Sequence, residues 1–334
     1  MKVAIVGAGR QGRRHALSIK QTGLGQIALV IDPDEHLASA LAKEYGAQSV
    51  ASMSQVLQSD VDAVVIASPV AAHHGAVIAS IAAGKHVFCE KPLALDTIEA
   101  SEMAKAAHEA GLILQCAFIM RHHPAMRLAK EWIDAGKLGA LTYAHCEYAR
   151  AKNFAKTWRA DRSQSGGGNL HDQAIHVLDL FRWYMGEVVE GISYRSTAVW
   201  DMAPLEDDVS GLLRMKTGAA ASFHVSYARW KPLFNFEIGG SDALIRIEGM
   251  GNPDYGTQKI TLIARNDVTG LGDVQESIEF FDLDRPWNDE WREFYDSVKS
   301  SRKPLGDGTD GAIALGLVEM LYQSSTYAKI EKTL

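Results

Sequence analysis

The sequence has few cysteines, and they do not form a recognisable pattern. Cys89, Cys116 and Cys146 are the only three in 334 residues, and none belongs to a Cys-x-x-Cys pair. An odd count does not suit a complete disulfide framework, so we expect buried, reduced thiols. The first ten residues, MKVAIVGAGR, begin a strand pattern directly and lack the apolar core of a signal peptide. Both observations predict a cytoplasmic protein.

Positive charge and long apolar runs are also scarce. The net charge is −7, and no long basic run occurs. Nucleic acids and anionic membranes are recognised by clustered Lys and Arg, so neither is expected as a main partner. No apolar run approaches the roughly 18 residues of a membrane-spanning helix. The 12 histidines show no metal-binding spacing such as His-Glu-x-x-His, so no metal is expected.

The length suits two domains, and the first 120 residues alternate strand and helix patterns. Helical patterns separate short, continuously apolar runs, which predicts a parallel sheet covered on both faces, a doubly wound Rossmann arrangement. The expected strands are 3–6, 27–31, 63–67, 86–89 and 112–116, and the expected helices are 11–21, 34–44, 72–83 and 97–110.

Residues 121–334 have a different pattern, with longer and more alternating strands that follow one another directly. This predicts a mostly antiparallel sheet with one solvated or interface face. A bare apolar sheet face is unusual, so we expect a homodimer or homotetramer through this sheet. The expected strands are 141–149, 191–200, 208–215, 219–227, 233–238, 243–248, 259–265 and 276–282. The expected helices are 169–185, 288–299 and 311–329, and the expected binding loops are 153–168 and 201–207.

A glycine turn follows the first strand, in the order Gly7-x-Gly9-x-x-Gly12. In a dinucleotide site, the first glycine permits the turn, the second admits the pyrophosphate and the third allows helix–strand packing. Asp32 ends the second strand, where it can accept hydrogen bonds from both ribose hydroxyls and repel a 2′-phosphate. This favours NAD over NADP, although Arg10 could attract that phosphate. The alternative is an ordinary turn without a ligand.

Glu90-Lys91-Pro92 follows the strand at 86–89, at the edge of the sheet where such folds bind ligands. A lysine there can hydrogen-bond a substrate hydroxyl and stabilise a developing alkoxide. Pro92 stiffens the turn and allows a cis peptide bond. In isolation, this tripeptide would more often be a surface turn.

In order and spacing, several motifs resemble the Gfo/Idh/MocA oxidoreductases, the glucose–fructose oxidoreductase and inositol dehydrogenase family. They are GAGRQGRRH, ASPVAAHH, AGKHVFCEKPLA, RHHPA, GGGNLHDQAIHVLDL and DGTDGAIALGLVEMLYQSS, which together span nearly the whole chain. The resemblance implies a Rossmann domain and hydride transfer between nicotinamide and a sugar or polyol carbon. It further implies a second, α/β domain with a large, open, mostly antiparallel sheet, used for substrate binding and oligomerisation. It assigns catalysis to Lys91, Asp172 and His176. The family often has Asn where this chain has Val70, so a side-chain contact from that position is in doubt.

Asp172 and His176 are four residues apart, so a regular helix places them on one face. With the family order, we expect His176, with a pKa near neutrality, to take the substrate proton as general base. Asp172 would bind a second hydroxyl or orient the histidine. The glycines at 166–168 would let the chain approach cofactor or substrate. Alone, this pair would more often be a first-turn acid and a core histidine.

Further site residues are predicted with less support from spacing. Arg121, His122 and His123 could line the cleft, His171 could touch substrate or cap its loop, and Asp179 is expected to be structural. Trp158, with Arg159 and Arg162, suits a sugar face or an anionic group such as carboxylate or phosphate. The predicted cofactor-binding residues are Gly7, Gly9, Arg10, Gln11, Gly12, Asp32, Ser68, Pro69, His73, Glu90 and Lys91. The predicted substrate-binding residues are Lys91, Arg121, Trp158, Arg159, His171, Asp172 and His176.

The sequence therefore predicts an NAD-dependent oxidoreductase of a secondary alcohol on a sugar, inositol or sugar derivative. Two alternatives stay open at this point. One is an enzyme for a non-sugar substrate such as a dihydrodiol. The other is a dinucleotide-binding regulator without catalysis, which could lose Lys91 or His176 freely, although this chain keeps both.

Overall fold

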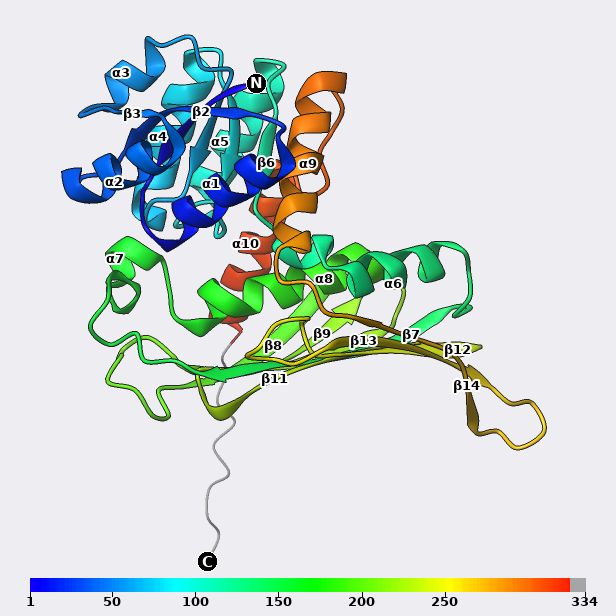
Figure 1. Cartoon of the computed structure of the whole chain (residues 1–334). Helices are drawn as coiled ribbons and strands as arrows, with labels where there is room; N and C mark the ends of the chain where they lie inside the picture. The colour runs from blue at the N-terminus through cyan, green and yellow to red at the C-terminus, as the bar shows by residue number, and fades with distance from the viewer. Residues whose placement is uncertain (325–334) are drawn as a thin grey trace, which may run out of the picture.

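A six-stranded parallel sheet forms the N-terminal part of the computed structural model, which describes residues 1–324 (Figure 1). Its strand order, β3-β2-β1-β4-β5-β6, is that of a Rossmann domain. The strands are β1 (Lys2–Val6), β2 (Gln26–Ile31), β3 (Gln48–Ser49), β4 (Ala63–Ile66), β5 (His86–Cys89) and β6 (Leu114–Cys116). β4 is buried at every residue, as expected for a strand covered on both faces.

The helices of this domain confirm the alternating pattern. They are α1 (Arg10–Thr22), α2 (Glu35–Tyr45), α3 (Met53–Leu57), α4 (His73–Ala82) and α5 (Thr97–Glu109). The sequence analysis did not predict α3 or β3. Both are very short, so neither contains enough residues to show a period.

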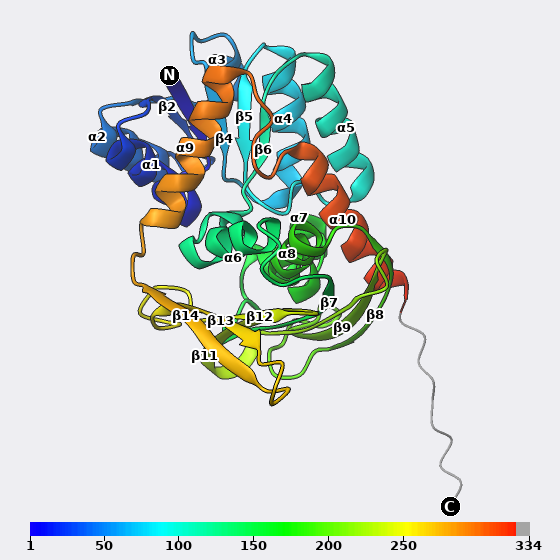
Figure 2. The ribbon, with the colours of Figure 1, turned by 90° about the vertical axis from the view of Figure 1, so that its right-hand side faces the viewer.

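An eight-stranded sheet forms the second layer, in the order β14-β13-β12-β11-β7-β10-β9-β8. Only β7 and β10 pair in parallel, which confirms the mostly antiparallel prediction. The strands are β7 (Leu141–Ala151), β8 (Val188–Ser196), β9 (Asp208–Met215), β10 (Ala220–Ser226), β11 (Ala228–Gly240), β12 (Ala243–Glu248), β13 (Gln258–Arg265) and β14 (Gly272–Phe280). Helices cover one face of this sheet, and the other face carries none (Figure 2).

The covering helices are α6 (Pro124–Asp134), α8 (Ile175–Met185) and part of α10 (Gly308–Gln323). α6 was not predicted, although its buried Met126, Ala129 and Trp132 recur at helical spacing. The predicted helix 169–185 is not one regular helix. Its first part, Leu170–Ala174, is a π-helix, and the regular α8 follows. Such irregular turns frequently occur at functional sites.

The C-terminal helices return to the Rossmann domain (Figures 1 and 2). Trp291 and Phe294 of α9 (Arg285–Ser300) pack in the same core as Phe88, with ring centroids of Phe88 and Phe294 5.5 Å apart. α10 ends at Gln323, so residues 325–329 of the predicted helix lie outside the described residues. Across residues 1–324, no helix is long and apolar enough to cross a membrane. All three cysteines are buried free thiols, as predicted.

Candidate active site

The glycine turn has the conformation that a dinucleotide site requires. Gly7 has φ +97°, and a Cβ there would lie 2.7 Å from the Ala67 backbone, so the turn presses against the end of β4. A Cβ on Gly12 would lie 1.8 Å from the Gly7 carbonyl oxygen. A Cβ on Gly9 would meet nothing within 4 Å, which leaves open space in front of the α1 N-terminus. Free N–H groups at that terminus suit a pyrophosphate.

Asp32 fixes the same turn from the end of β2. Its carboxylate accepts hydrogen bonds from the backbone amides of Ala8, at 2.7 Å, and Asp34, at 2.9 Å. The buried Ser68 hydroxyl, beyond β4, has no partner in the structure. An open cradle at Gly9, a carboxylate at the ribose position and an unpartnered hydroxyl together fit NAD.

Glu90 links the glycine helix to the Lys91 turn. Gln11 Nε2 donates to its carboxylate at 2.9 Å, His15 Nε2 lies 2.8 Å away, and the Lys91 amide donates at 3.2 Å. Burial would raise the pKa of Glu90, but His15 and the neighbouring Lys91 hold it below its usual value. Gln11 and Glu90, both predicted to bind cofactor, therefore bind each other. His15 was missed, because its role depends on a contact 75 residues away.

His73 has a positioning role instead of the predicted cofactor contact. It is 1% exposed, and its Nδ1 lies 3.0 Å from the Pro92 carbonyl oxygen while Nε2 lies 3.0 Å from that of Ser68. Both ring nitrogens face backbone carbonyl oxygens, and a neutral imidazole can donate to only one of them at a time. The ring is therefore directed at the protein and not at a cofactor in this conformation, which corrects the prediction. The ring ties the loop after β4 to the turn after Lys91, whose peptide bond to Pro92 is cis, as the sequence allowed.

Lys91 and Asp172 meet where the two domains face each other. The Lys91 Nζ lies 2.8 Å from Asp172 Oδ1, and Arg159 Nε lies 3.5 Å from Oδ2. The Tyr227 hydroxyl donates to Oδ2 at 2.5 Å. Burial would raise the pKa of Asp172, but the Lys91 ammonium and the Arg159 guanidinium hold it far below its ordinary value. Asp172 is thus held as a carboxylate by hydrogen bonds from Lys91 and Tyr227 and by the nearby Arg159 charge.

His176 lies one helical turn further along, in α8. It is 6% exposed, its Nδ1 has no hydrogen-bond partner, and its ring meets that of Phe118 edge-on at 6.4 Å. Burial, reinforced by the Lys91 charge, lowers the pKa of His176 well below its ordinary value, against the opposing effect of Asp172. The expected pKa near neutrality is therefore wrong for this conformation. The imidazole is neutral, which is the form a general base needs.

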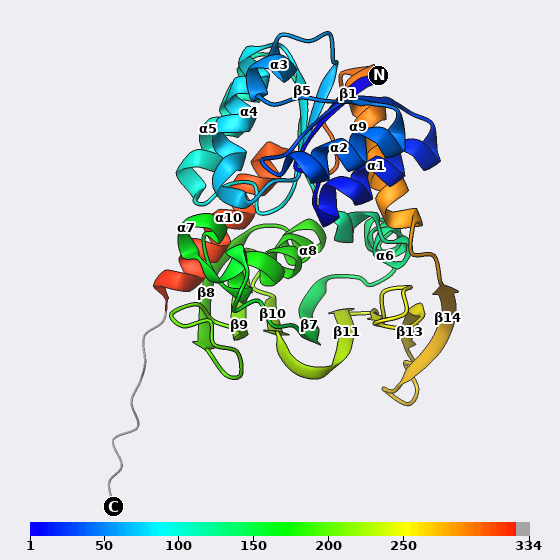
Figure 3. The same ribbon diagram turned by 60° about the vertical axis from the view of Figure 1, so that its left-hand side comes forward.

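A pocket beside Asp172 is walled by both predicted binding loops. Trp158 and Arg159 come from the first loop, Met202 comes from the second, and Tyr227 follows β10. The first loop contains two short helical turns, Trp158–Ala160 and α7 (Arg162–Ser165). α7 lies between the Rossmann domain and the large sheet (Figure 3). The remaining lining residues are Val70, Pro92, Phe154, Ser165, Gly167, Gly168 and Asp172.

The three glycines before Asp172 are packed against the protein itself. A Cβ on Gly166 would lie 2.5 Å from the His171 ring, one on Gly167 would lie 2.4 Å from the Tyr322 hydroxyl, and one on Gly168 would lie 2.4 Å from the Glu206 carbonyl oxygen. The close approach predicted toward a ligand is therefore an approach to these three residues. It fixes the loop from which the π-helix begins.

Two residues predicted to contact substrate, His171 and Arg121, are buried instead. The His171 ring is 3% exposed beneath Gly166, and burial lowers its pKa to about 4. Arg121 is 3% exposed and donates two hydrogen bonds to Asp179 and one to Asp310. Neither side chain presents a surface to substrate in this conformation. Asp179 is structural, as predicted.

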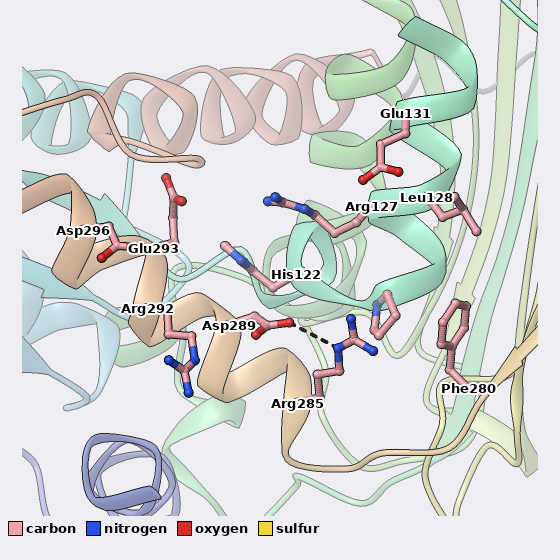
Figure 4. Close-up of a pocket in the computed structure, with 11 residues that line it drawn as sticks. His122, Arg127, Leu128, Glu131, Phe280, Arg285, Asp289, Arg292, Glu293 and Asp296 are labelled. Atoms are coloured by element: carbon pink, nitrogen blue, oxygen red, sulfur yellow. Dashed lines mark ion pairs between the residues drawn. The ribbon is translucent and has the colours of Figure 1, made fainter. Parts of the chain in front are cut away.

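A separate pocket lies between α6, α9 and β14, away from Lys91 (Figure 4). His122 lines this pocket instead of the predicted cleft. His123 is buried, contacts Gln258 and lies near enough to His176 for its charge to lower the pKa of that residue. Burial lowers the pKa of His122 to about 3. Acidic and basic side chains are mixed here, including the Arg285–Asp289 ion pair drawn in the figure. Among residues 1–324, no group of three or more His, Cys, Asp or Glu could hold a metal ion.

Comparisons with known proteins agree with this geometry. Residues 1–118 match a family model described as an oxidoreductase family with an NAD-binding Rossmann fold, and residues 126–246 match the GFO/IDH/MocA C-terminal domain. A 1,5-anhydro-D-fructose reductase of Ensifer adhaerens is 29% identical, over 94% of this chain and 93% of its own. A myo-inositol 2-dehydrogenase of Thermotoga maritima is 27% identical, over 94% and 93%. A levoglucosan dehydrogenase complex with NADH and levoglucosan has the same fold, with a TM-score of 0.89 at 22% identity over 97% and 96% of the two chains.

Proposed function

Because the chain belongs to the Gfo/Idh/MocA oxidoreductase family, we propose that it transfers hydride between NAD and a secondary alcohol or ketone carbon of a sugar, inositol or sugar derivative. One observation carries the proposal. Lys91 lies in the turn after β5, and its ammonium is 2.8 Å from the Asp172 carboxylate of the second domain. His176 lies one helical turn beyond Asp172. The similarity to sugar and inositol oxidoreductases over more than nine-tenths of the chain supports the substrate class.

In the oxidative direction, each of these residues has a separate chemical role. Lys91 donates a hydrogen bond to the reacting oxygen and stabilises its developing negative charge. The neutral His176 imidazole accepts the hydroxyl proton. Asp172 fixes the Lys91 ammonium and accepts a hydrogen bond from a neighbouring substrate hydroxyl. When bound, NAD supplies the hydride acceptor, and the protein supplies position and electrostatics.

NAD rather than NADP is the proposed cofactor. The Asp32 carboxylate holds the glycine turn and would repel a 2′-phosphate, which favours NAD. Arg10 is the residue that could attract that phosphate, and it is exposed beside the glycine turn. Gly7, Gly9 and Gly12 are proposed to hold the pyrophosphate, with Ser68 and Pro69 bordering it.

The proposal is tested by following NADH formation with NAD and NADP in parallel, across free sugars, inositols, sugar derivatives and a dihydrodiol. Turnover of one polyol with NAD is expected, and Lys91→Ala should then abolish most turnover while the NADH dissociation constant stays within about twofold. Turnover of the dihydrodiol alone would reject the sugar substrate class. NADH binding without any turnover would favour the regulator.

We also propose a homodimer or homotetramer through the large sheet. Its helix-free face exposes Tyr143, Ile192, Tyr194, Leu212 and Val274, and Tyr194 is 61% exposed. Side chains of this kind are usually covered by a partner. Light scattering after size exclusion tests this, since a monomer at micromolar concentration would contradict it.

The remaining assignments are supported by composition and packing. Reduced, buried thiols support a cytoplasmic location, and a net charge of −7 supports the absence of nucleic-acid or membrane partners. We keep the domain boundary after residue 120 as a proposal, with α9 and part of α10 packing back on the first domain.

A further inference from the structure

Lys152 is a half-buried cation immediately after β7. Its Nζ lies 4.5 Å from the centroid of the Phe154 ring, and that ring lines the pocket beside Asp172. In the part of the chain that the structure describes, no acidic side chain forms an ion pair with Lys152. A lysine with restricted access to water and no ion-pair partner is unfavourable unless something else uses its charge.

Arg159 holds a second positive charge against the same ring. Its guanidinium carbon lies 5.0 Å from the Phe154 centroid and 4.3 Å from that of Trp158. Its single acidic neighbour among the ion pairs of residues 1–324 is Asp172, at 3.5 Å. Two cations therefore flank one aromatic wall of the pocket.

The local charge balance is strongly positive. Burial, followed by repulsion from Arg150, Arg10 and Arg159, lowers the pKa of Lys152 to about 8, and Asp172 opposes the shift. The Asp172 carboxylate is already held by the donors described above. Arg150 has its own counter-charge in Asp254, at 3.7 Å. For Lys152 and Arg159 the nearby acid is Asp172, and this excess of positive charge is typical of a site that binds an anion.

Arg10 differs from the other two cations in its position. It directly follows Gly9 at the start of α1, where the pyrophosphate is expected, although it is near enough to repel Lys152. Lys152 and Arg159 belong to the second domain, beside the ring and carboxylate that line the pocket. Arg10 would therefore face the cofactor, whereas Lys152 and Arg159 border the pocket beside Asp172.

We infer that the substrate is an anionic sugar or polyol, whose carboxylate or phosphate group is bound by Lys152 and Arg159. This inference rests on the proposed function and deepens it by naming the substrate class. The reacting hydroxyl would lie toward Lys91 and His176, and the anionic group toward the Phe154 wall.

The test compares kcat/KM for neutral hexoses and inositols, the corresponding hexuronic and aldonic acids, and hexose phosphates. We expect one acidic class to exceed its neutral counterpart by at least about tenfold. Lys152→Met should lower the acidic-to-neutral ratio by about 10- to 100-fold, mainly through KM, as expected for loss of a charged hydrogen bond. Lys156→Met is the matched control, because Lys156 is exposed in the same loop.

The outcomes separate this inference from the proposed function. Preference for carboxylates or for phosphates identifies the group. Equal use of neutral and acidic substrates, or an unchanged ratio in Lys152→Met, overturns the inference and leaves the proposed function standing. If Lys152→Met weakened NADH binding but left the acidic-to-neutral ratio of kcat/KM unchanged, Lys152 would be assigned to the cofactor and the inference would also be overturned. No turnover of any substrate would count against the proposed function itself.

A second readout needs no variant. The KM of the wild-type enzyme for the acidic substrate should rise as the pH passes about 8, because Lys152 loses its proton there, while the KM for a neutral substrate should not follow. A KM that is flat for both substrates between about pH 7 and about pH 9 would contradict the role of Lys152.

Discussion

Replacing Tyr227 with Phe removes one hydroxyl from the active site and leaves the aromatic ring. That hydroxyl donates to Asp172 Oδ2 at 2.5 Å. The ring meets that of Phe154 edge-on, with centroids 5.0 Å apart, so the packing of the pocket wall should survive the substitution. The variant therefore isolates the contribution of one hydrogen bond to the carboxylate.

The magnitude follows from the charge on Asp172. A hydrogen bond to a charged group contributes about 1.5–3 kcal/mol, so the pKa of Asp172 should rise by about one to two units. The Lys91 and Arg159 charges still keep that pKa low, so Asp172 stays ionised near neutral pH. The expected fall in kcat/KM is about 10- to 100-fold, because the carboxylate is less firmly placed against Lys91.

The same change should lower stability in a pH-dependent way. The folded-state pKa of Asp172 is depressed, so its ionisation contributes stability that is present above the unfolded pKa of about 4 and is lost as the pH falls from that value through the much lower folded pKa. The difference in free energy of unfolding between wild type and Tyr227→Phe should therefore persist through neutral and mildly acidic pH, and shrink only when the pH approaches the folded-state pKa of the variant.

Steady-state kinetics, NADH titration and thermal melts measure these effects together. Tyr143→Phe is the matched control, since Tyr143 lies on β7 outside the pocket and its hydroxyl donates to Glu237 of β11 at 2.7 Å. The control should keep kcat/KM. If Tyr227→Phe retained kcat/KM within about twofold, the reasoning that Tyr227 holds the catalytic carboxylate would be refuted.

Three further changes test the site in other ways. His176→Ala should lower kcat by about 10²–10⁴-fold with NADH binding retained in fluorescence titrations, and wild-type turnover would reject it as the base. Asp32→Ser should shift the ratio of kcat/KM toward NADP, whereas an unchanged ratio would mean that the carboxylate does not contact the ribose. Gly168→Ala should lower the free energy of unfolding by about 1–3 kcal/mol in denaturant titrations, because its Cβ would lie 2.4 Å from the Glu206 carbonyl oxygen. Gly75→Ala, which meets nothing within 4 Å, should not destabilise the protein, and equal losses in both would contradict the packing argument.

The features predicted correctly from sequence are those with a local signal. A glycine turn between a strand and a helix, with Asp32 at the end of the next strand, is complete within about thirty residues. Strand and helix periods identify most of both sheets for the same reason. The position of Lys91 in the turn after β5 was also local information, and the structure places it against Asp172. The catalytic roles of Lys91, Asp172 and His176 came from the family resemblance and stay predictions.

The features missed depend on contacts between distant residues. Tyr227 reaches Asp172 across 55 positions, and His15 reaches Glu90 across 75. Periodicity cannot reveal such a pair, because the sequence around one residue does not depend on which distant residue it contacts.

What the sequence by itself determined is therefore the architecture and the glycine turn of the cofactor domain, and it suggested the residues proposed for catalysis. Tertiary structure decided which polar groups are free. Burial converted Arg121, His73 and His171 from expected ligand contacts into packed or positioning residues, and it lowered the pKa of His176. The physical reason is that desolvation and pairing are properties of the folded surroundings, whereas periodicity and turn chemistry are properties of the local chain.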